Sequence, residues 1–140
     1  MLEKNFVEVY DKFKLQFYRK VFELVRERDG SLSATEAYTV DVIFLLGDPT
    51  ITKLAETLGI SQPNATYKVN NLAAKGYVMR LPSSGDKRET RVCVSDRFYK
   101  YYGDLDHFAD RAVEALQAEY TPEELELMER MLRSLSKHVE

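Results

Sequence analysis

The sequence predicts a mainly α-helical protein of about six helices that carries one β-hairpin. Three longer segments repeat apolar side chains at helical spacing, namely residues 5–28, 33–46 and 122–139. Residues 96–118 are rich in acidic side chains and are expected to form a further helix with Ser95 as its N-cap. Between these segments, residues 51–58 and 62–75 have the pattern of two short amphipathic helices joined by a tight turn. Residues 77–81 and 90–94 then read as two strands around a Pro-Ser-Ser-Gly break. This order of helix, turn, helix and hairpin is that of a winged helix-turn-helix.

The two short helices have clear boundary signals. Apolar side chains from Ile51 to Leu58 recur at i, i+3, i+4 and i+7, which places them on one helix face. Gly59 accepts the left-handed backbone conformation that ends a helix. Ser61 is a favourable N-cap for the next helix, and Pro63 falls in its first turn, where a missing N–H costs little.

The second short helix has one apolar and one polar face. Ala65, Val69 and Leu72 follow each other at i, i+4 and i+7 and predict the buried face. The opposite face carries Gln62, Asn64, Thr66, Tyr67 and Lys68. A core needs none of these side chains, and all of them can bond to base edges or phosphates. A polar helix face is often only solvated, but its position after a helix and a turn favours contact with DNA.

The distribution of charge supports this interpretation. The net charge of the chain is −3, which by itself is unusual for a DNA-binding protein. Residues 50–100, however, contain nine Lys and Arg and four Asp and Glu, a net charge of +5. Residues 1–49 carry −2 and residues 101–140 carry −6. Positive charge is therefore concentrated on the segment that would bind DNA, where it matters most.

The helix pair LAETLGISQPNATYKVNNLAAKG, the wing sequence Asp86-Lys87-Arg88 and the strand RVCVS resemble the MarR family of bacterial transcription regulators. The resemblance spans essentially the whole chain. It implies an intertwined homodimer that binds double-stranded DNA, usually as a repressor that responds to a ligand. It also implies that Arg88 enters the minor groove and that Asp86 braces the wing. Three positions depart from the family pattern: Tyr67 stands where a basic residue is common, Lys68 where the residue is usually apolar, and Phe98 where a glycine is common after the wing.

From these features we expect three groups of DNA contacts on a palindromic operator. Phosphates would be bound by Thr50, Ser61, Tyr67 and Lys68. Bases would be read by Gln62, Asn64 and Thr66. The wing tip would contribute Lys87 and Arg88, with Arg88 favouring narrow A·T tracts.

The first and last helices carry more apolar surface than a winged helix can cover. We therefore expect residues 1–48 and 96–140 to form a helical dimerisation region and residues 49–95 the DNA-binding region, within one compact domain. A helical core inside one chain, with the dimer formed elsewhere, is the alternative. Phe13 and Phe17 are candidates for a small-molecule effector pocket, as the resemblance implies, although core and dimer packing is the more direct explanation of such aromatic side chains.

Other function classes have weaker signals. The sequence has no run of 18 apolar residues and a charged N-terminal segment, so we expect a cytoplasmic protein without a signal peptide or membrane span. Cys93 is the only cysteine, which excludes an internal disulfide. Cys93 and His107 are a possible nucleophile and base, but no orienting motif surrounds them, so we predict neither an enzyme nor a cofactor. A redox switch at Cys93 has no supporting motif.

Two alternative functions remain open on the same architecture. Asp104, His107 and Asp110 fall at i, i+3 and i+6, which places them nearly on one helix face. Such a set of ligands would suit a regulator that responds to a metal ion. With one local histidine this set lacks the nitrogen and sulfur ligands that zinc prefers, so we predict no metal site. The other alternative is a dimerising interaction module without DNA binding, which the basic segment argues against.

Overall fold

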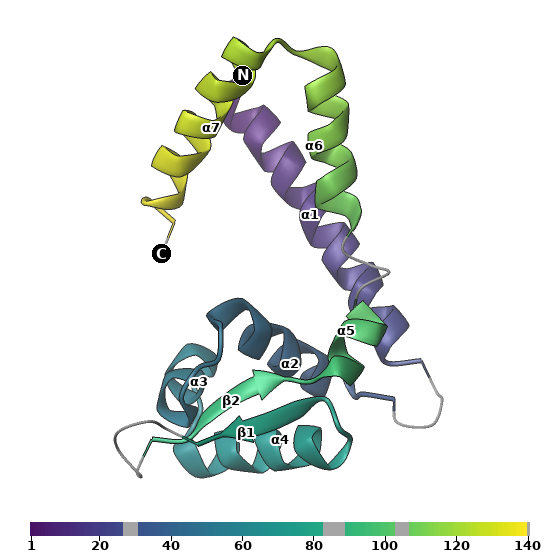
Figure 1. The fold of residues 1–140 in the computed structure, drawn as a ribbon, viewed down its shortest axis with the longest axis vertical. Helices are drawn as coiled ribbons and strands as arrows, with labels where there is room; N and C mark the ends of the chain where they lie inside the picture. Colours follow the sequence, from purple (N-terminus) through teal and green to yellow (C-terminus); the bar gives the residue numbers. More distant parts are fainter. Residues whose placement is uncertain (27–30, 83–88, 103–106, 140) are drawn as a thin grey trace. The chain divides into compact units, whose positions relative to one another are not determined.

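The computed structural model describes residues 1–26, 31–82, 89–102 and 107–139 of the chain. The chain divides into two compact units, Met1–Gly103 and Asp104–Glu140, which are described separately. The described residues form seven helices and one antiparallel pair of strands (Figure 1). The predicted fold class, mainly α with a winged helix-turn-helix, is confirmed.

In the first unit the elements are α1 (Leu2–Leu24), α2 (Ala34–Leu46), α3 (Ile51–Leu58), α4 (Gln62–Ala74), β1 (Val78–Leu81), β2 (Arg91–Val94) and α5 (Asp96–Tyr102). The second unit contains α6 (His107–Glu119) and α7 (Pro122–Ser136). In the hairpin, Val78 pairs with Val94 and Leu81 pairs with Arg91. Within the described ranges, no helix is both long enough and apolar enough to cross a membrane.

Side-chain caps fix the helix starts where the sequence predicts them. The Ser33 hydroxyl accepts the Glu36 N–H at 3.2 Å, and the Glu36 carboxylate accepts the Ser33 N–H at 2.8 Å, a complete capping box for α2. Thr50 accepts the Lys53 N–H at the start of α3 at 3.1 Å. Ser61 caps α4 in the same way. Each cap satisfies a backbone donor that the helix leaves unpaired and typically contributes ~1 kcal/mol.

The core of the first unit lies among α2, α3, α4, the hairpin and α5. The predicted apolar face of α4 is confirmed, because Ala65, Val69 and Leu72 are fully buried. From the other elements, the largest fully buried apolar side chains are Val40, Ile43, Leu54, Tyr77, Val92 and Phe98. Burying side chains of this size stabilises the fold by roughly 1.5–3 kcal/mol each. This packing holds α4 in place through its apolar face.

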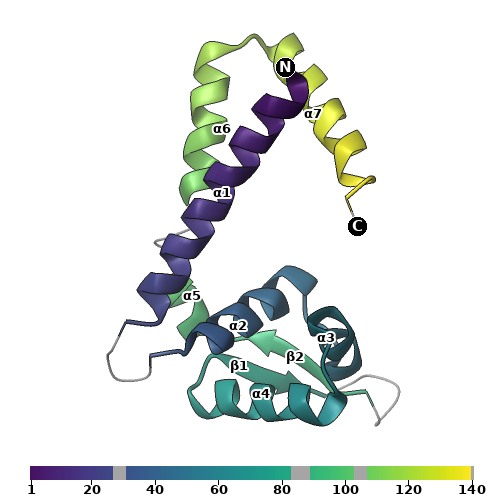
Figure 2. The ribbon, with the colours of Figure 1, turned by 180° about the vertical axis from the view of Figure 1, so that it is seen from behind.

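Only the C-terminal end of α1 joins this core. Val21 is buried there, and the Phe17 ring stacks on Tyr38 of α2 with centroids 5.9 Å apart. The N-terminal part of α1 runs away from the winged helix in both views (Figures 1 and 2). The helix ends at Leu24, with Val25 as its C-cap, and so is shorter at this end than the predicted 5–28. Residues 27–30 lie outside the described part.

The prediction of a single helix over residues 96–118 differs from the structure. The described residues form two helices, α5 and α6, on either side of residues 103–106, which are not described. Residues 103–106 include Gly103, a residue with low helix propensity, which the prediction placed inside one helix.

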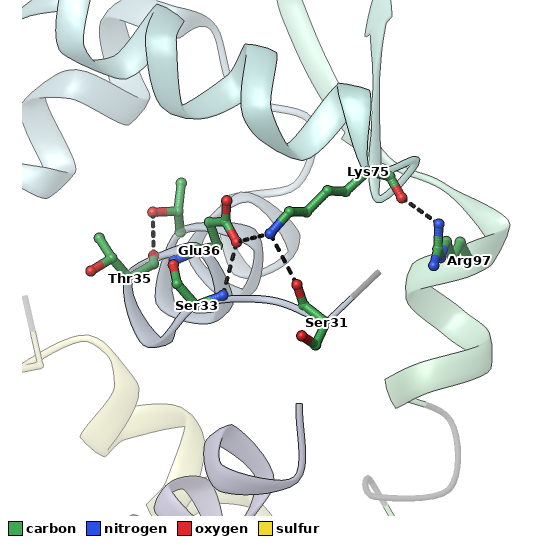
Figure 3. Close-up of polar contacts among 7 residues, drawn as sticks. Ser31, Ser33, Thr35, Glu36, Lys75 and Arg97 are labelled. Carbon is green, nitrogen blue, oxygen red and sulfur yellow. Dashed lines mark hydrogen bonds and ion pairs between the residues drawn. The ribbon is translucent and has the colours of Figure 1, made fainter. Parts of the chain in front are cut away.

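A polar network joins the end of α4 to the start of α2 (Figure 3). The Lys75 ammonium donates to the Glu36 carboxylate at 2.7 Å and to the Ser31 carbonyl at 2.9 Å. The Arg97 guanidinium of α5 donates to the Lys75 carbonyl at 2.6 Å, which places a further cation at the negative end of α4.

Ser95, the residue immediately before α5, also contacts the end of α4. Its hydroxyl donates to the Gly76 carbonyl, in the turn that follows α4, and the residue is buried. Gly76 adopts a φ of 81°, the left-handed conformation predicted after this helix. The C-terminus of α4 is thus bound by residues of α2, of α5 and of the segment between β2 and α5.

The second unit is a helical pair with an apolar surface. Thr121 and Glu124 form the predicted capping box of α7. None of the described residues of α6 and α7 is buried. The exposed apolar side chains of this pair are Val113, Leu127, Met128, Met131, Leu132 and Leu135.

Candidate nucleic-acid interface

The polar side of α4 faces away from the core. Gln62, Asn64 and Tyr67 are exposed, and the Tyr67 side chain is 65% accessible. Thr66 and Lys68 are half-buried. The sequence thus predicted the exposed face correctly, with the two half-buried residues at its margin. The fully buried stripe on the other side of α4 holds this face in a fixed orientation.

The N-terminus of α4 is linked to α3 by a hydrogen bond between side chains. The Gln62 amide donates through Nε2 to Oγ1 of Thr52 at 3.0 Å. Both residues border a polar cavity of about 260 Å³ between α3, α4 and the base of the hairpin, which is also lined by Thr50, Thr66 and Arg80. The sequence analysis missed Thr52, because a contact across ten residues follows no local period.

The start of α3 is attached to β2 through the backbone. The Ile51 N–H donates to the Thr90 carbonyl at 3.2 Å, and the Val92 N–H donates to the Pro49 carbonyl at 2.9 Å. Thr50 lies in this bridge and caps α3. A hydroxyl that accepts a backbone N–H still has its own proton to donate. Thr50 and Ser61 can therefore cap their helices and bind a phosphate oxygen.

Arg80 is a second residue that the sequence analysis did not select. It lies on β1, and its guanidinium donates to the Asn70 side chain of α4 at 2.5 Å. It was counted in the basic segment, but its position beside α4 depends on the fold. The wing-tip candidates Asp86, Lys87 and Arg88 lie outside the described residues, so their roles stay predictions.

Comparison with known proteins agrees with this geometry. Residues 32–90 match the model of the MarR family. The chain is 27% identical over 134 residues to the HTH-type transcriptional regulator YcgE of Bacillus subtilis (strain 168), covering 91% of this chain and 87% of that protein. The winged helix-turn-helix segment of the chain therefore matches the MarR family of transcription regulators.

Solved structures share the fold of this chain. FabT of Streptococcus pneumoniae, solved in complex with DNA, aligns with a TM-score of 0.61 and 22% identity over 99% of this chain and 94% of that one. NadR, solved in complex with 4-hydroxyphenylacetate, aligns with a TM-score of 0.56 and 20% identity over 100% and 94%. At these identities the likeness shows the fold alone.

The other candidate residues of this chain lie away from α4. Phe13 is 44% accessible on α1, whereas Phe17 packs against Tyr38 and the core. These positions neither test nor exclude an effector pocket. Cys93 is half-buried on β2, and burial, followed by the negative charge of Asp48, raises the pKa of its thiol. A raised pKa lowers the fraction of reactive thiolate, which weakens the case for a redox switch.

The possible metal ligands lie on the second unit. His107 is exposed on α6 and pairs with Asp110 at 3.8 Å, while Asp104 lies outside the described residues. In the part of the chain that the structure describes, no three His, Cys, Asp or Glu residues lie close enough to hold a metal ion. The metal-responsive alternative gains no support from this arrangement.

Proposed function

We propose that this chain is a MarR-family regulator that binds a specific double-stranded DNA sequence as a homodimer. The observation that carries the proposal is the two-sided character of α4. Its apolar stripe is fully buried, and its exposed face presents side chains that form hydrogen bonds, within a segment of net charge +5. FabT, whose fold is similar, was solved in complex with DNA, which supports DNA binding by this chain.

In the proposed complex α4 lies in the major groove and α3 crosses the DNA backbone. Asn64 and Thr66 contact base edges, together with Gln62 at the N-terminal end of the helix. Tyr67 and Lys68 bind phosphates, as do the capping hydroxyls of Thr50 and Ser61. The wing contributes Lys87 and Arg88, with Arg88 in the minor groove and Asp86 bracing the wing.

The proposal of a homodimer rests on uncovered apolar surface. Phe6, Val9 and Phe13 follow each other along α1, and between 44% and 52% of each is accessible. On α7, Met131 and Leu132 are 59% and 52% accessible. A second copy can cover such surfaces on both chains through a two-fold axis, because each copy presents the same patch. We therefore retain residues 1–48 and 96–140 as the proposed dimerisation region and residues 49–95 as the reading head.

A selection of bound sequences from random duplexes, made with the full chain, tests this function. We expect a palindrome whose half-site centres lie about one helical turn apart, since two identical reading heads bind it. Raising the salt concentration should weaken binding steeply, since phosphate contacts release counterions. Enrichment of no duplex would overturn the proposal. A monomer in light scattering at micromolar concentration would overturn the dimer alone.

We further propose that DNA binding represses a promoter and responds to a small-molecule effector. NadR, which has a similar fold, was solved with 4-hydroxyphenylacetate, a small aromatic acid. In this chain the aromatic side chains around Phe17 and Tyr38 lie where α1 meets α2, so a ligand there would alter how the reading head is held. Release of a labelled operator on titration with aromatic carboxylates tests this part. Unchanged binding across such a series would count against it.

A further inference from the structure

One hydrogen bond fixes a side chain at the start of the recognition helix before any DNA is present. Gln62 is the first residue of α4, and its amide donates to the Thr52 hydroxyl on α3 at 3.0 Å. Both residues are exposed. Among the described residues, the carbonyl oxygen of this amide has no hydrogen-bond partner. The amide nitrogen of Gln62 is therefore held by Thr52, while the amide oxygen is open to a ligand.

We infer that Thr52 positions Gln62 to read an adenine in the major groove, an inference that rests on the proposed DNA binding. A primary amide has two N–H donors and one carbonyl acceptor. The bond to Thr52 uses one donor and leaves one N–H and the carbonyl oxygen. Adenine presents N7 as an acceptor and N6 as a donor, which is the complementary pair. No other base presents this pair in the major groove in the geometry that a glutamine amide matches.

The position of the pair in the fold supports this role. Base edges are contacted mainly from the N-terminal end of a recognition helix, where Gln62 lies. A free glutamine on the surface samples many rotamers and loses that freedom when it binds. The bond to Thr52 restricts the side chain beforehand, so less entropy is lost on binding DNA. Thr52 acts through Gln62 and is a positioning residue.

The test uses the full chain and the operator that it selects. Affinity is measured for the four possible base pairs at each half-site position, with Gln62→Ala, Thr52→Val and Thr52→Ser. We expect Gln62→Ala to reduce one preference for A·T by about 5- to 150-fold, the usual range for a lost bidentate contact. Thr52→Val should reduce the same preference while binding to the other three base pairs stays within about twofold. Thr52→Ser keeps the hydroxyl and should restore the preference.

Thr57→Val is the matched control on the same helix. Thr57 is exposed, and its hydroxyl donates to the Lys53 carbonyl within α3 at 2.8 Å. The substitution Thr57→Val removes a threonine hydroxyl from α3, as Thr52→Val does, but this hydroxyl does not contact Gln62. The base preference should therefore not change. In the Gln62→Ala background, Thr52→Val should have no further effect on preference, because the two residues act as one unit.

The outcomes separate this inference from the proposed function. A uniform loss of affinity in Thr52→Val on all sequences would assign Thr52 to the phosphate backbone or to folding, and would overturn the inference. So would a preference at the Gln62 position for a base other than adenine. An operator that is selected normally, with base preferences unaltered in all three variants, would overturn the inference and leave the proposed function intact. A parent chain that selects no duplex would overturn both.

Discussion

Lys75 and Glu36 are 39 residues apart in the sequence, and their charged groups meet at 2.7 Å. Lys75 ends α4, and Glu36 closes the capping box of α2. One carboxylate thus serves both the start of one helix and the end of another. The Glu36 side chain is 17% accessible and that of Lys75 is 36% accessible, so the pair is partly withdrawn from water.

The first prediction is that Lys75→Met lowers the stability of the protein by about 1–3 kcal/mol. The variant leaves a partly buried carboxylate without the ammonium that pairs with it, and a lost hydrogen bond to a charged group costs that much. Urea unfolding at pH 7 measures it. The control is Lys12→Met, which breaks an ion pair with Glu8 that is exposed on both sides and should change stability little. Equal losses of unfolding free energy in the two variants would show that the pair of Lys75 and Glu36 stabilises the protein no more than an exposed ion pair does.

Stability should also fall in acid because of Glu36. Burial raises the pKa of this carboxyl, but hydrogen bonds from Lys75 and from the Ser33 N–H outweigh burial, so the net pKa lies below the ordinary value of 4.5. A lowered folded pKa stabilises the protein fully above pH 4.5, and this contribution is lost as pH falls through the folded pKa. The stability difference between the parent and Glu36→Gln should therefore be constant above pH 4.5 and shrink below it. Urea titrations from about pH 3 to 7 measure it; a constant difference throughout would contradict the linkage.

Weakening the apolar face of α7 should dissociate the proposed dimer. The double variant Met131→Gln, Leu132→Gln should raise the dimer dissociation constant at least about tenfold, because two apolar side chains no longer leave water on association. Analytical ultracentrifugation measures it. Arg130→Gln introduces the same polar group on the neighbouring polar side of α7 and should leave the constant unchanged. If the double variant associates like the parent, this face is not the interface.

Base and phosphate contacts on α4 should respond differently to mutation. Asn64→Ala should blunt the preference at one base pair per half-site, a loss of ~1–3 kcal/mol there. Lys68→Ala should weaken all sequences alike and lower the salt slope by about one. Affinity measured on the selected operator and its single-base variants, at several salt concentrations, distinguishes the two. Parent-like binding by both variants would show that the reading face lies elsewhere.

Metal removal should not affect DNA binding. His107 has one carboxylate neighbour, Asp110, among the described residues, and zinc needs three or four ligands. Elemental analysis of protein purified without added metal, together with operator binding in the presence of a chelator, checks this. One metal per chain that is lost in His107→Ala would instead favour the metal-responsive regulator.

Local signals explain what the sequence could predict. The caps at Ser33, Thr50 and Ser61 and the glycine turn depend on residues within four positions of each other, so spacing alone identifies them. The polar face of α4 follows from its 3.6-residue period. The partners of side chains from different elements do not follow from spacing. Thr52 with Gln62 and Arg97 with Lys75 therefore became visible only in the fold.

The two backbone bonds between β2 and the start of α3 limit how an effector can act. They join the base of the wing to the helix pair at 3.2 Å and 2.9 Å, while buried side chains join the same elements from within. The recognition helix and the wing base therefore move together. In the proposed regulation, an effector that releases the operator has to tilt or shift the whole reading head relative to that of the second copy, without changing the geometry inside either head. For that reason, substitutions that change the preferred operator sequence should leave the response to the proposed effector unchanged, and the reverse should also hold.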